Sequence, residues 1–154
     1  MKVCVDAGHG GSDPGAVGTV PFDVEEQAVN LAVAGRVEAA LEERGHWAVM
    51  TRRQDRTLST VARADFANRL GADLFVSVHA NAAASPHVEG MEVYHVPGSG
   101  AGQHAAHEIR WQLMTRFPDH RDRGVKEANF TVLRRTWMPA VLVAVSYTHL
   151  TLPT

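Results

Sequence analysis

The 154-residue chain has little that marks an unusual class of protein. It contains one cysteine, its aromatic residues amount to 6%, and its formal net charge at pH 7 is −2. One cysteine excludes an intramolecular disulfide, and a net charge near zero argues against nucleic-acid binding. No apolar run approaches the roughly 20 residues of a membrane-spanning helix. The remaining composition, 45% hydrophobic and 21% charged, is typical of one globular domain large enough to bury a core.

The most informative segment lies at the start of the chain. A short apolar run over 3–7 predicts a buried strand, and it ends in Gly8-His9-Gly10-Gly11. The glycines allow a sharp turn and a close approach to a bound group, and the end of such a strand is where open α/β sheets place ligands. The segment has neither the Gly-Lys-Ser/Thr ending nor the GxGxxG spacing of nucleotide-binding loops.

A second histidine repeats this arrangement, because the apolar run 74–78 ends in His79. In a parallel sheet both imidazoles would lie at the same edge. Hydrolytic zinc sites commonly combine two histidines with a glutamate and a water molecule. A predicted helix over 24–43 supplies the carboxylate: Glu26 continues its apolar stripe of Val29, Val33, Val37 and Leu41, whereas Glu25 faces solvent. A buried acid needs a partner, and a metal ion is one.

With these residues in place, the chain resembles the zinc-dependent N-acetylmuramoyl-L-alanine amidase family (Amidase_3) over residues 1 to about 145. The resemblance implies that His9, Glu26 and His79 bind Zn²⁺, and that the substrate is the amide between N-acetylmuramic acid and L-alanine in peptidoglycan. The matching segments are 6–11, 13–16, Glu26 with 29–31, 51–52 with Asp55, Leu58 and Arg63, 67–68, 72–73, 77–82, Gly90 with Glu92, 123–126, 132–134 and 139–143.

One departure from the family concerns catalysis. After a strand resembling 139–143, the family has a glutamate that acts as the acid/base, but this chain has Ala144 and then an unrelated tail. No catalytic residue can therefore be assigned, and we expect little activity. We interpret 1–145 as a catalytic domain that is incomplete at its C-terminus and 146–154 as a tail foreign to the family, from truncation, frameshift or joined sequence. The family's C-terminal helix would be missing, which would leave part of one sheet face bare.

Two other functions stay open at this point. If Ala144 is genuine, the chain could be a non-catalytic, zinc-containing domain that binds or regulates peptidoglycan. The paired histidines alone would also allow a zinc hydrolase for another amide. The resemblance implies action at the cell wall, in the periplasm or outside the cell, on peptidoglycan. The first strand begins at residue 2, so we expect no signal peptide, and the export route stays open. We expect a monomer.

Several other residues have simpler interpretations. Asn81 could bind substrate or fix its own turn, and Asp6 could orient a ligand histidine or cap the glycine loop. Arg52 and Arg63 are expected to be structural, and Glu92 is expected on a solvated strand face. Cys4 is expected in the core. The histidines outside the motifs are expected mostly at the surface: His46, His87, His95, His104, His107, His120 and His149.

The order of elements predicts an α/β fold. We expect a single domain with a mostly parallel twisted sheet, helices on both faces, and the zinc site at the carboxyl ends of the strands. The segments 82–89 and 118–123 are expected to be loops, the first beside the active site. The predicted strands are 2–7, 46–51, 74–79, 90–95 and 140–145, and the predicted helices are 24–43, 58–70 and 102–117.

Overall fold

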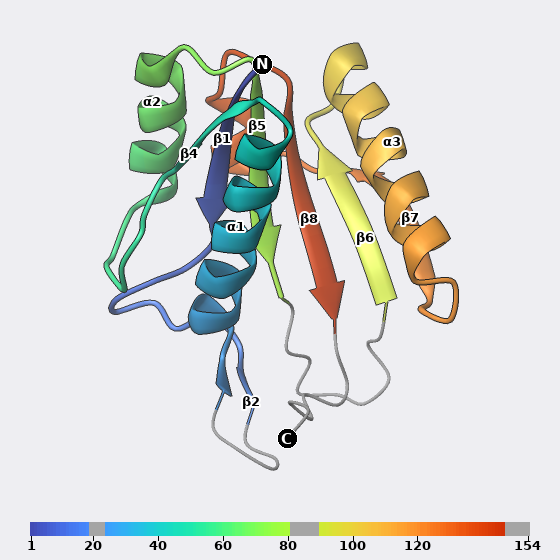
Figure 1. The fold of residues 1–154 in the computed structure, drawn as a ribbon, viewed down its shortest axis with the longest axis horizontal. Helices are drawn as coiled ribbons and strands as arrows, with labels where there is room; N and C mark the ends of the chain where they lie inside the picture. The colour runs from blue at the N-terminus through green and yellow to red at the C-terminus, as the bar shows by residue number, and fades with distance from the viewer. Residues whose placement is uncertain (19–23, 81–89, 147–154) are drawn as a thin grey trace.

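The computed structural model describes residues 1–18, 24–80 and 90–146. Its centre is a six-stranded sheet in the order β4-β1-β5-β8-β6-β7, in which every pairing is parallel except that of β6 with β8 (Figure 1). The prediction of a mostly parallel sheet is confirmed. The strands are β1 (Lys2–Ala7), β4 (Trp47–Met50), β5 (Leu74–His79), β6 (Gly90–His95), β7 (Asp122–Glu127) and β8 (Ala140–Ser146).

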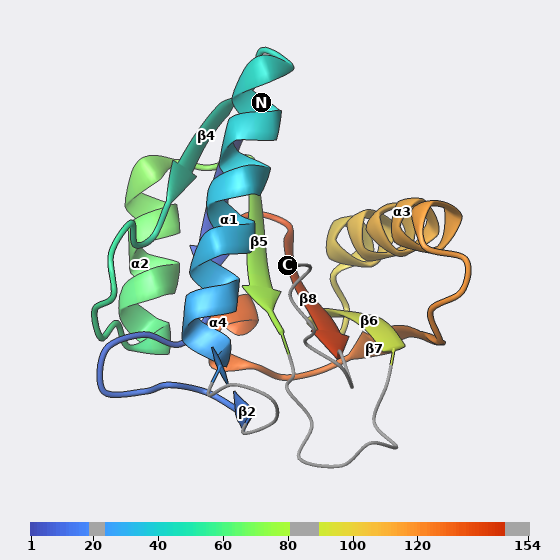
Figure 2. The same cartoon turned by 60° about the horizontal axis from the view of Figure 1, so that its bottom comes forward.

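Helices cover both faces of this sheet, as the alternation of elements predicts. Helices α1 (Glu26–Glu43) and α3 (Gly100–Arg116) pack on one face, and α2 (Thr60–Leu70) and α4 (Thr131–Arg134) pack on the other (Figures 1 and 2). A separate two-stranded ribbon, β2 (Val17–Gly18) with β3 (Val24–Glu25), leads into α1. Among the described residues, no helix has the length and apolarity to cross a membrane.

Alternate residues of strand β5 pack into the cores on opposite faces of the sheet. Successive side chains of a strand point to opposite sides. Phe75 is fully buried among Ala67, Leu133 and other residues on the α2/α4 face, whereas Val76 and Val78 pack on the face covered by α1 and α3. Cys4 lies in the same core as Phe75, as expected, and burial raises the pKa of its thiol to about 12. The thiol therefore stays protonated and unreactive.

The expected apolar stripe of α1 is wrong in part. Its most buried row is Glu26, Asn30, Ala34 and Glu38, while Val33 is 38% exposed. The most buried row is small or polar because Ala34 allows close packing and the polar residues have partners there, whereas Val37 and Leu41 of the expected stripe pack against the core only partly buried. Glu38, for example, accepts both hydrogen bonds of the Arg53 guanidinium, at 2.6 and 2.8 Å. Burial of Glu26 and exposure of Glu25 agree with the prediction.

Part of the segment predicted as an exposed loop is a strand. β7 begins at Asp122 and pairs with β6 at the edge of the sheet. Its sequence, Asp-Arg-Gly-Val-Lys-Glu, has Val125 as its single large apolar residue. Such a polar sequence is compatible with an edge strand, which is only partly buried. The pairing is also irregular between Met91 and Glu92. Composition alone therefore favours a loop at this position.

An apolar groove of about 520 Å³ lies on the face of the sheet that carries α1 and α3. Within the described residues, no helix covers this part of the sheet. Its lining residues are contributed by the facing sides of the two helices and by the strands beneath them, including Val33, Val37, Leu41, Val76, Ile109 and Leu113.

Candidate metal centre

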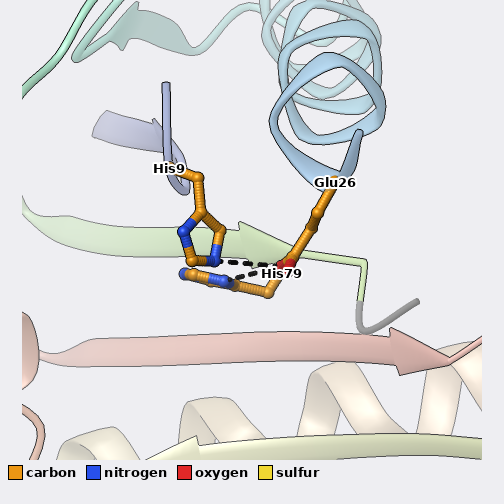
Figure 3. Close-up of side chains that lie close together, drawn as sticks. All are labelled: His9, Glu26 and His79. Carbon is orange, nitrogen blue, oxygen red and sulfur yellow. Dashed lines mark hydrogen bonds and ion pairs between the residues drawn. The ribbon is translucent and has the colours of Figure 1, made fainter. Parts of the chain in front are cut away.

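Three side chains meet at the carboxyl ends of β1 and β5 (Figure 3). His9 follows the end of β1, Glu26 is the first residue of α1, and His79 is the last residue of β5. Glu26 Oε1 lies 3.3 Å from His9 Nε2 and 3.1 Å from His79 Nδ1. One ligand atom from each residue lies within 4.8 Å of the other two. The structure thus brings together the three residues that the sequence singles out.

The spacing of these atoms fits a small metal ion. Ligands at zinc-like bond lengths of about 2.0–2.1 Å in a tetrahedron are separated by about 3.3 Å. The two distances from Glu26 Oε1 match that separation. The imidazole rings of His9 and His79 are almost perpendicular, at 81°, with centroids 4.9 Å apart, so they do not stack against one another. Two imidazole nitrogens and one carboxylate oxygen form a donor set suited to zinc.

Asp13 orients His9. Its Oδ2 lies 2.9 Å from His9 Nδ1, on the side of the ring away from Glu26. A neutral imidazole that donates from Nδ1 keeps its Nε2 lone pair for a metal, and carboxylates commonly hold ligand histidines in this way. The hydrogen bond with Glu26 raises the pKa of His9; burial opposes this shift, and Asp13 reinforces it.

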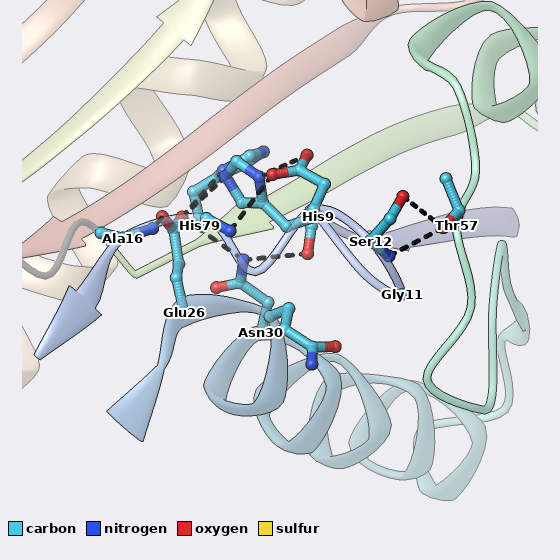
Figure 4. A network of polar contacts seen from close by, with 12 residues as sticks. His9, Gly11, Ser12, Ala16, Glu26, Asn30, Thr57 and His79 are labelled. Carbon is cyan, nitrogen blue, oxygen red and sulfur yellow. Dashed lines mark hydrogen bonds and ion pairs between the residues drawn. The ribbon is translucent and has the colours of Figure 1, made fainter. Parts of the chain in front are cut away.

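Glu26 is held both by the loop before β2 and by its own helix (Figure 4). Its carboxylate accepts hydrogen bonds from the Ala16 amide at 3.0 Å and from Asn30 Nδ2 at 3.4 Å, and Asn30 also donates to the Gly8 carbonyl. Burial by itself would raise the pKa of Glu26, but the hydrogen bonds from His79 and His9 outweigh it and hold the pKa well below its usual range. The acid is therefore an anion, as a metal ligand must be.

Two glycines make room for the cluster. A Cβ at Gly8 would lie 2.4 Å from the His79 ring, and a Cβ at Gly15 would lie 2.7 Å from His9 and 2.8 Å from Glu26. Gly15 also has a φ of +68°, which favours glycine. The backbone thus approaches the side chains more closely than any other residue type would allow.

Two buried arginines fix the loop that carries His9. Arg63 donates to the carbonyls of Ala7 and His9, and Arg52 donates to those of Ala7 and Gly8 and also to that of Gln27 in α1. Arg52 therefore ties the His9 loop to the helix that begins with Glu26. Burial lowers the pKa of Arg52, and the nearby Arg63 acts in the same direction. The structural role expected for both arginines is confirmed.

Asp6 does not orient a ligand histidine in the described structure. Its carboxylate accepts hydrogen bonds from Thr51, Arg63 and Ser77, and it contacts the glycine loop only through Arg63. At the far end of that loop, the Gly11 amide donates to Asp55 at 2.6 Å and the Ser12 amide to Thr57 at 2.9 Å (Figure 4). The loop is thus anchored at both ends.

A cleft of about 400 Å³ opens beside the cluster. Its lining includes His79, Tyr94 and Phe130, together with Leu142 and Ala144 of β8. Ala144 is paired with His79 on β5 and with Glu92 on β6. These three residues therefore share one row on one face of the sheet. The methyl group of Ala144 offers no proton acceptor beside the cluster.

The expectation that Glu92 lies on a solvated strand face is wrong. Glu92 is 2% exposed, and its carboxylate is paired with Lys126 and Arg123 from β7. His95 is also buried rather than at the surface, with its Nδ1 3.0 Å from the Val96 carbonyl. Both residues lie on β6, which is covered on both sides by other strands, so their burial depends on contacts distant in sequence.

Some sequence predictions lie outside the described residues, and some site residues were missed. Asn81, the loop 82–89, His87 and His149 lie outside the described ranges. Asp13 and Asn30 contact the cluster but had no predicted role. The spacing of four residues between His9 and Asp13, and between Glu26 and Asn30, is the signal that could have suggested them.

The fold and the cluster together define a candidate metal centre at the strand ends of an α/β sheet. The sequence matches the N-acetylmuramoyl-L-alanine amidase family (Amidase_3) over residues 3–150, and the chain belongs to this family. A solved structure of AmiC2, an N-acetylmuramoyl-L-alanine amidase of Nostoc punctiforme, is 38% identical. The match covers 93% of this chain and 77% of that one, with a TM-score of 0.84.

Curated relatives agree with this assignment. N-acetylmuramoyl-L-alanine amidase CwlM of Bacillus licheniformis is 38% identical over 142 residues, covering 92% of this chain and 54% of that protein. An endolysin of Bacillus phage SPP1 is 37% identical over 147 residues, covering 91% of this chain and 52% of the endolysin. The chain thus spans about half the length of these curated relatives.

Proposed function

We propose that this chain is a zinc-dependent peptidoglycan amidase domain whose substrate is the amide between N-acetylmuramic acid and L-alanine. The convergence of His9, Glu26 and His79 at the strand ends, in a chain of this family, is the observation that carries the proposal. We propose 1–145 as the domain and 146–154 as a tail outside it; the family match itself runs to residue 150. The partner is peptidoglycan, and the place of action is the cell wall.

The chemistry that a zinc ion supplies at such a site is a water molecule of lowered pKa and a polarised amide carbonyl. Neighbouring residues orient His9 and keep Glu26 ionised. Asp13 holds His9 with Nε2 toward Glu26, and the hydrogen bonds on Glu26 keep its carboxylate ionised. The cleft beside His79 provides space for the groups that flank the scissile bond. Together these features favour binding and orientation of an amide at the cluster.

Ala144 is expected to limit the rate of amide hydrolysis at this site. A general acid–base group typically contributes about 10²–10⁴ in rate, and an alanine beside His79 contributes none of it. We infer that the chain holds zinc and binds peptidoglycan but hydrolyses it slowly. The second candidate function, a non-catalytic zinc-containing domain that binds or regulates peptidoglycan, is favoured by the same residue.

The test is a long incubation of the zinc-loaded chain with purified cell walls, with a His79→Ala variant as control. A slow amidase releases new N-terminal L-alanine, leaves the number of glycan reducing ends unchanged, and loses this activity in His79→Ala. Sedimentation with cell walls without any product, together with a stoichiometric zinc content, supports the binding domain instead. New reducing ends or a different N-terminal residue would overturn the proposed amide specificity.

A further inference from the structure

A group of charged residues on β6 and β7, which the metal centre does not use, adjoins the cleft through Tyr94, whose ring centroid lies 5.9 Å from Lys126 Nζ. Buried Glu92 accepts a hydrogen bond from Lys126 Nζ at 2.6 Å and is paired with Arg123 Nε at 3.2 Å. The two cations come from β7, and their side chains are 40% and 25% exposed. Tyr94, which lines the cleft, also hydrogen-bonds Glu92. The group therefore extends from Tyr94 in the lining of the cleft to the partly exposed side chains of Arg123 and Lys126.

This group has an excess of positive charge. Two cations share one carboxylate, and among the described residues Glu92 is the acidic partner of both. Asp122, on the same strand, is paired with Arg110 instead. A lysine ammonium has three donors and an arginine guanidinium has five, so both cations keep donors for a further acceptor. Their partial exposure leaves these donors accessible.

The distance from the metal centre suits a ligand that spans both places. One strand, β8, separates His79 from Glu92 in the paired row. Neighbouring strands are about 4.8 Å apart, so the two residues lie roughly 10 Å from one another. An extended peptide advances about 3.3–3.6 Å per residue. A peptide cut at the cluster would thus reach the cations within its first two or three residues.

We propose that Arg123 and Lys126, positioned by Glu92, form a subsite for a free carboxylate of an acidic stem peptide. The inference rests on the proposed function, because it places the scissile amide at His9, Glu26 and His79. Charge-assisted hydrogen bonds to a carboxylate are about twice as strong as neutral ones, so this subsite distinguishes acidic from amidated peptides. Glu92 is a positioning residue here: its carboxylate is engaged by two cations and separated from the cluster by β8.

The experiment measures equilibrium binding of two probes to the zinc-loaded chain at low ionic strength. One probe is a muramoyl dipeptide with glutamate as its second residue, and the other is the same compound with its peptide carboxylates converted to carboxamides. We expect the native chain to bind the acidic probe about five- to tenfold more tightly. Lys126→Met brings this ratio close to one, and Lys126→Arg restores most of it. Arg123→Met gives a second, independent variant.

Arg44→Met is the matched control, because it also removes one positive charge but lies just beyond the end of α1, where Arg44 donates to the Ala40 carbonyl. It leaves the ratio unchanged. Equal binding of both probes to the native chain would overturn the subsite while leaving the proposed function intact. So would a ratio that survives both Lys126→Met and Arg123→Met. Failure of both probes to bind would overturn the subsite and the use of this cleft for substrate.

Discussion

Ala144 lies beside His79 in adjacent parallel strands, and both residues line the cleft next to the candidate metal centre. On its other side, Ala144 is paired with Glu92 of β6. A buried alanine between a histidine of the cluster and a salt-bridged glutamate leaves a space without a titratable group. We therefore expect this position to decide whether the site only holds substrate or also hydrolyses it.

Ala144→Glu should raise the rate of cell-wall amide hydrolysis by about 10²–10⁴-fold, because it places a carboxylate beside His79 that can transfer a proton. The measurement is release of N-terminal L-alanine at saturating zinc. Ala144→Gln is the control, since it has nearly the same shape but no acid. Equal rates for the native chain and Ala144→Glu would mean that another group performs the proton transfer.

Asp13→Asn should weaken zinc binding by about 10–100-fold, because the carboxylate that orients His9 through Nδ1 is lost. Competition with a chromogenic chelator measures the affinity. Asp119→Asn, an exposed position between α3 and β7, removes the same charge and should leave the affinity unchanged. An unaltered affinity in Asp13→Asn would show that His9 does not bind the metal through the ring orientation seen here.

Gly15→Ala should remove zinc binding, whereas Gly45→Ala should not. Both glycines have a positive φ, at +68° and +77°, so both substitutions carry a similar backbone cost of about 1–2 kcal/mol. Only at Gly15 would the new Cβ collide with His9 and Glu26; nothing lies within 4 Å at Gly45. Zinc content and melting temperature of the two variants separate these effects. Stoichiometric zinc in Gly15→Ala would argue against the close packing described here.

The metal-free protein should lose stability as pH rises through the pKa of His9. That pKa is raised above its ordinary value of 6.5, chiefly by Glu26, so the stabilisation is complete below about pH 6.5 and disappears at higher pH. The pKa of Glu26 is lowered, so its contribution is complete above about pH 4.5 and is lost as pH falls toward the lowered value.

Zinc binding requires neutral imidazoles, so the gain in melting temperature on adding zinc should widen between about pH 6 and 8. Thermal melts with chelator and with zinc across this range measure the gap. The variant His9→Gln should show neither the loss in the metal-free protein nor the widening gap. A gap that is constant with pH in the native chain would contradict the assignment of His9 as a ligand.

The main features of the site could be predicted from local pattern. Two short apolar runs that end in His9 and His79 identify parallel strand ends, and the place of Glu26 on the expected apolar face of its helix predicts its burial. These features depend on residues close together in the chain, where the periods of strand and helix decide which side faces the core. The fold class follows from the same alternation of strands and helices.

Other features were decided by the tertiary structure alone. Asp13 rather than Asp6 orients His9, because the turn after His9 brings the Asp13 carboxylate to Nδ1 of the ring. The Asp6 carboxylate instead accepts hydrogen bonds from Thr51, Arg63 and Ser77. Glu92 is buried because Lys126 and Arg123, more than 30 positions away, neutralise it. β7 is a strand because β6 pairs with it, although its sequence is mostly charged. Charged residues reveal burial only when their partners are known, and those partners come from elsewhere in the fold.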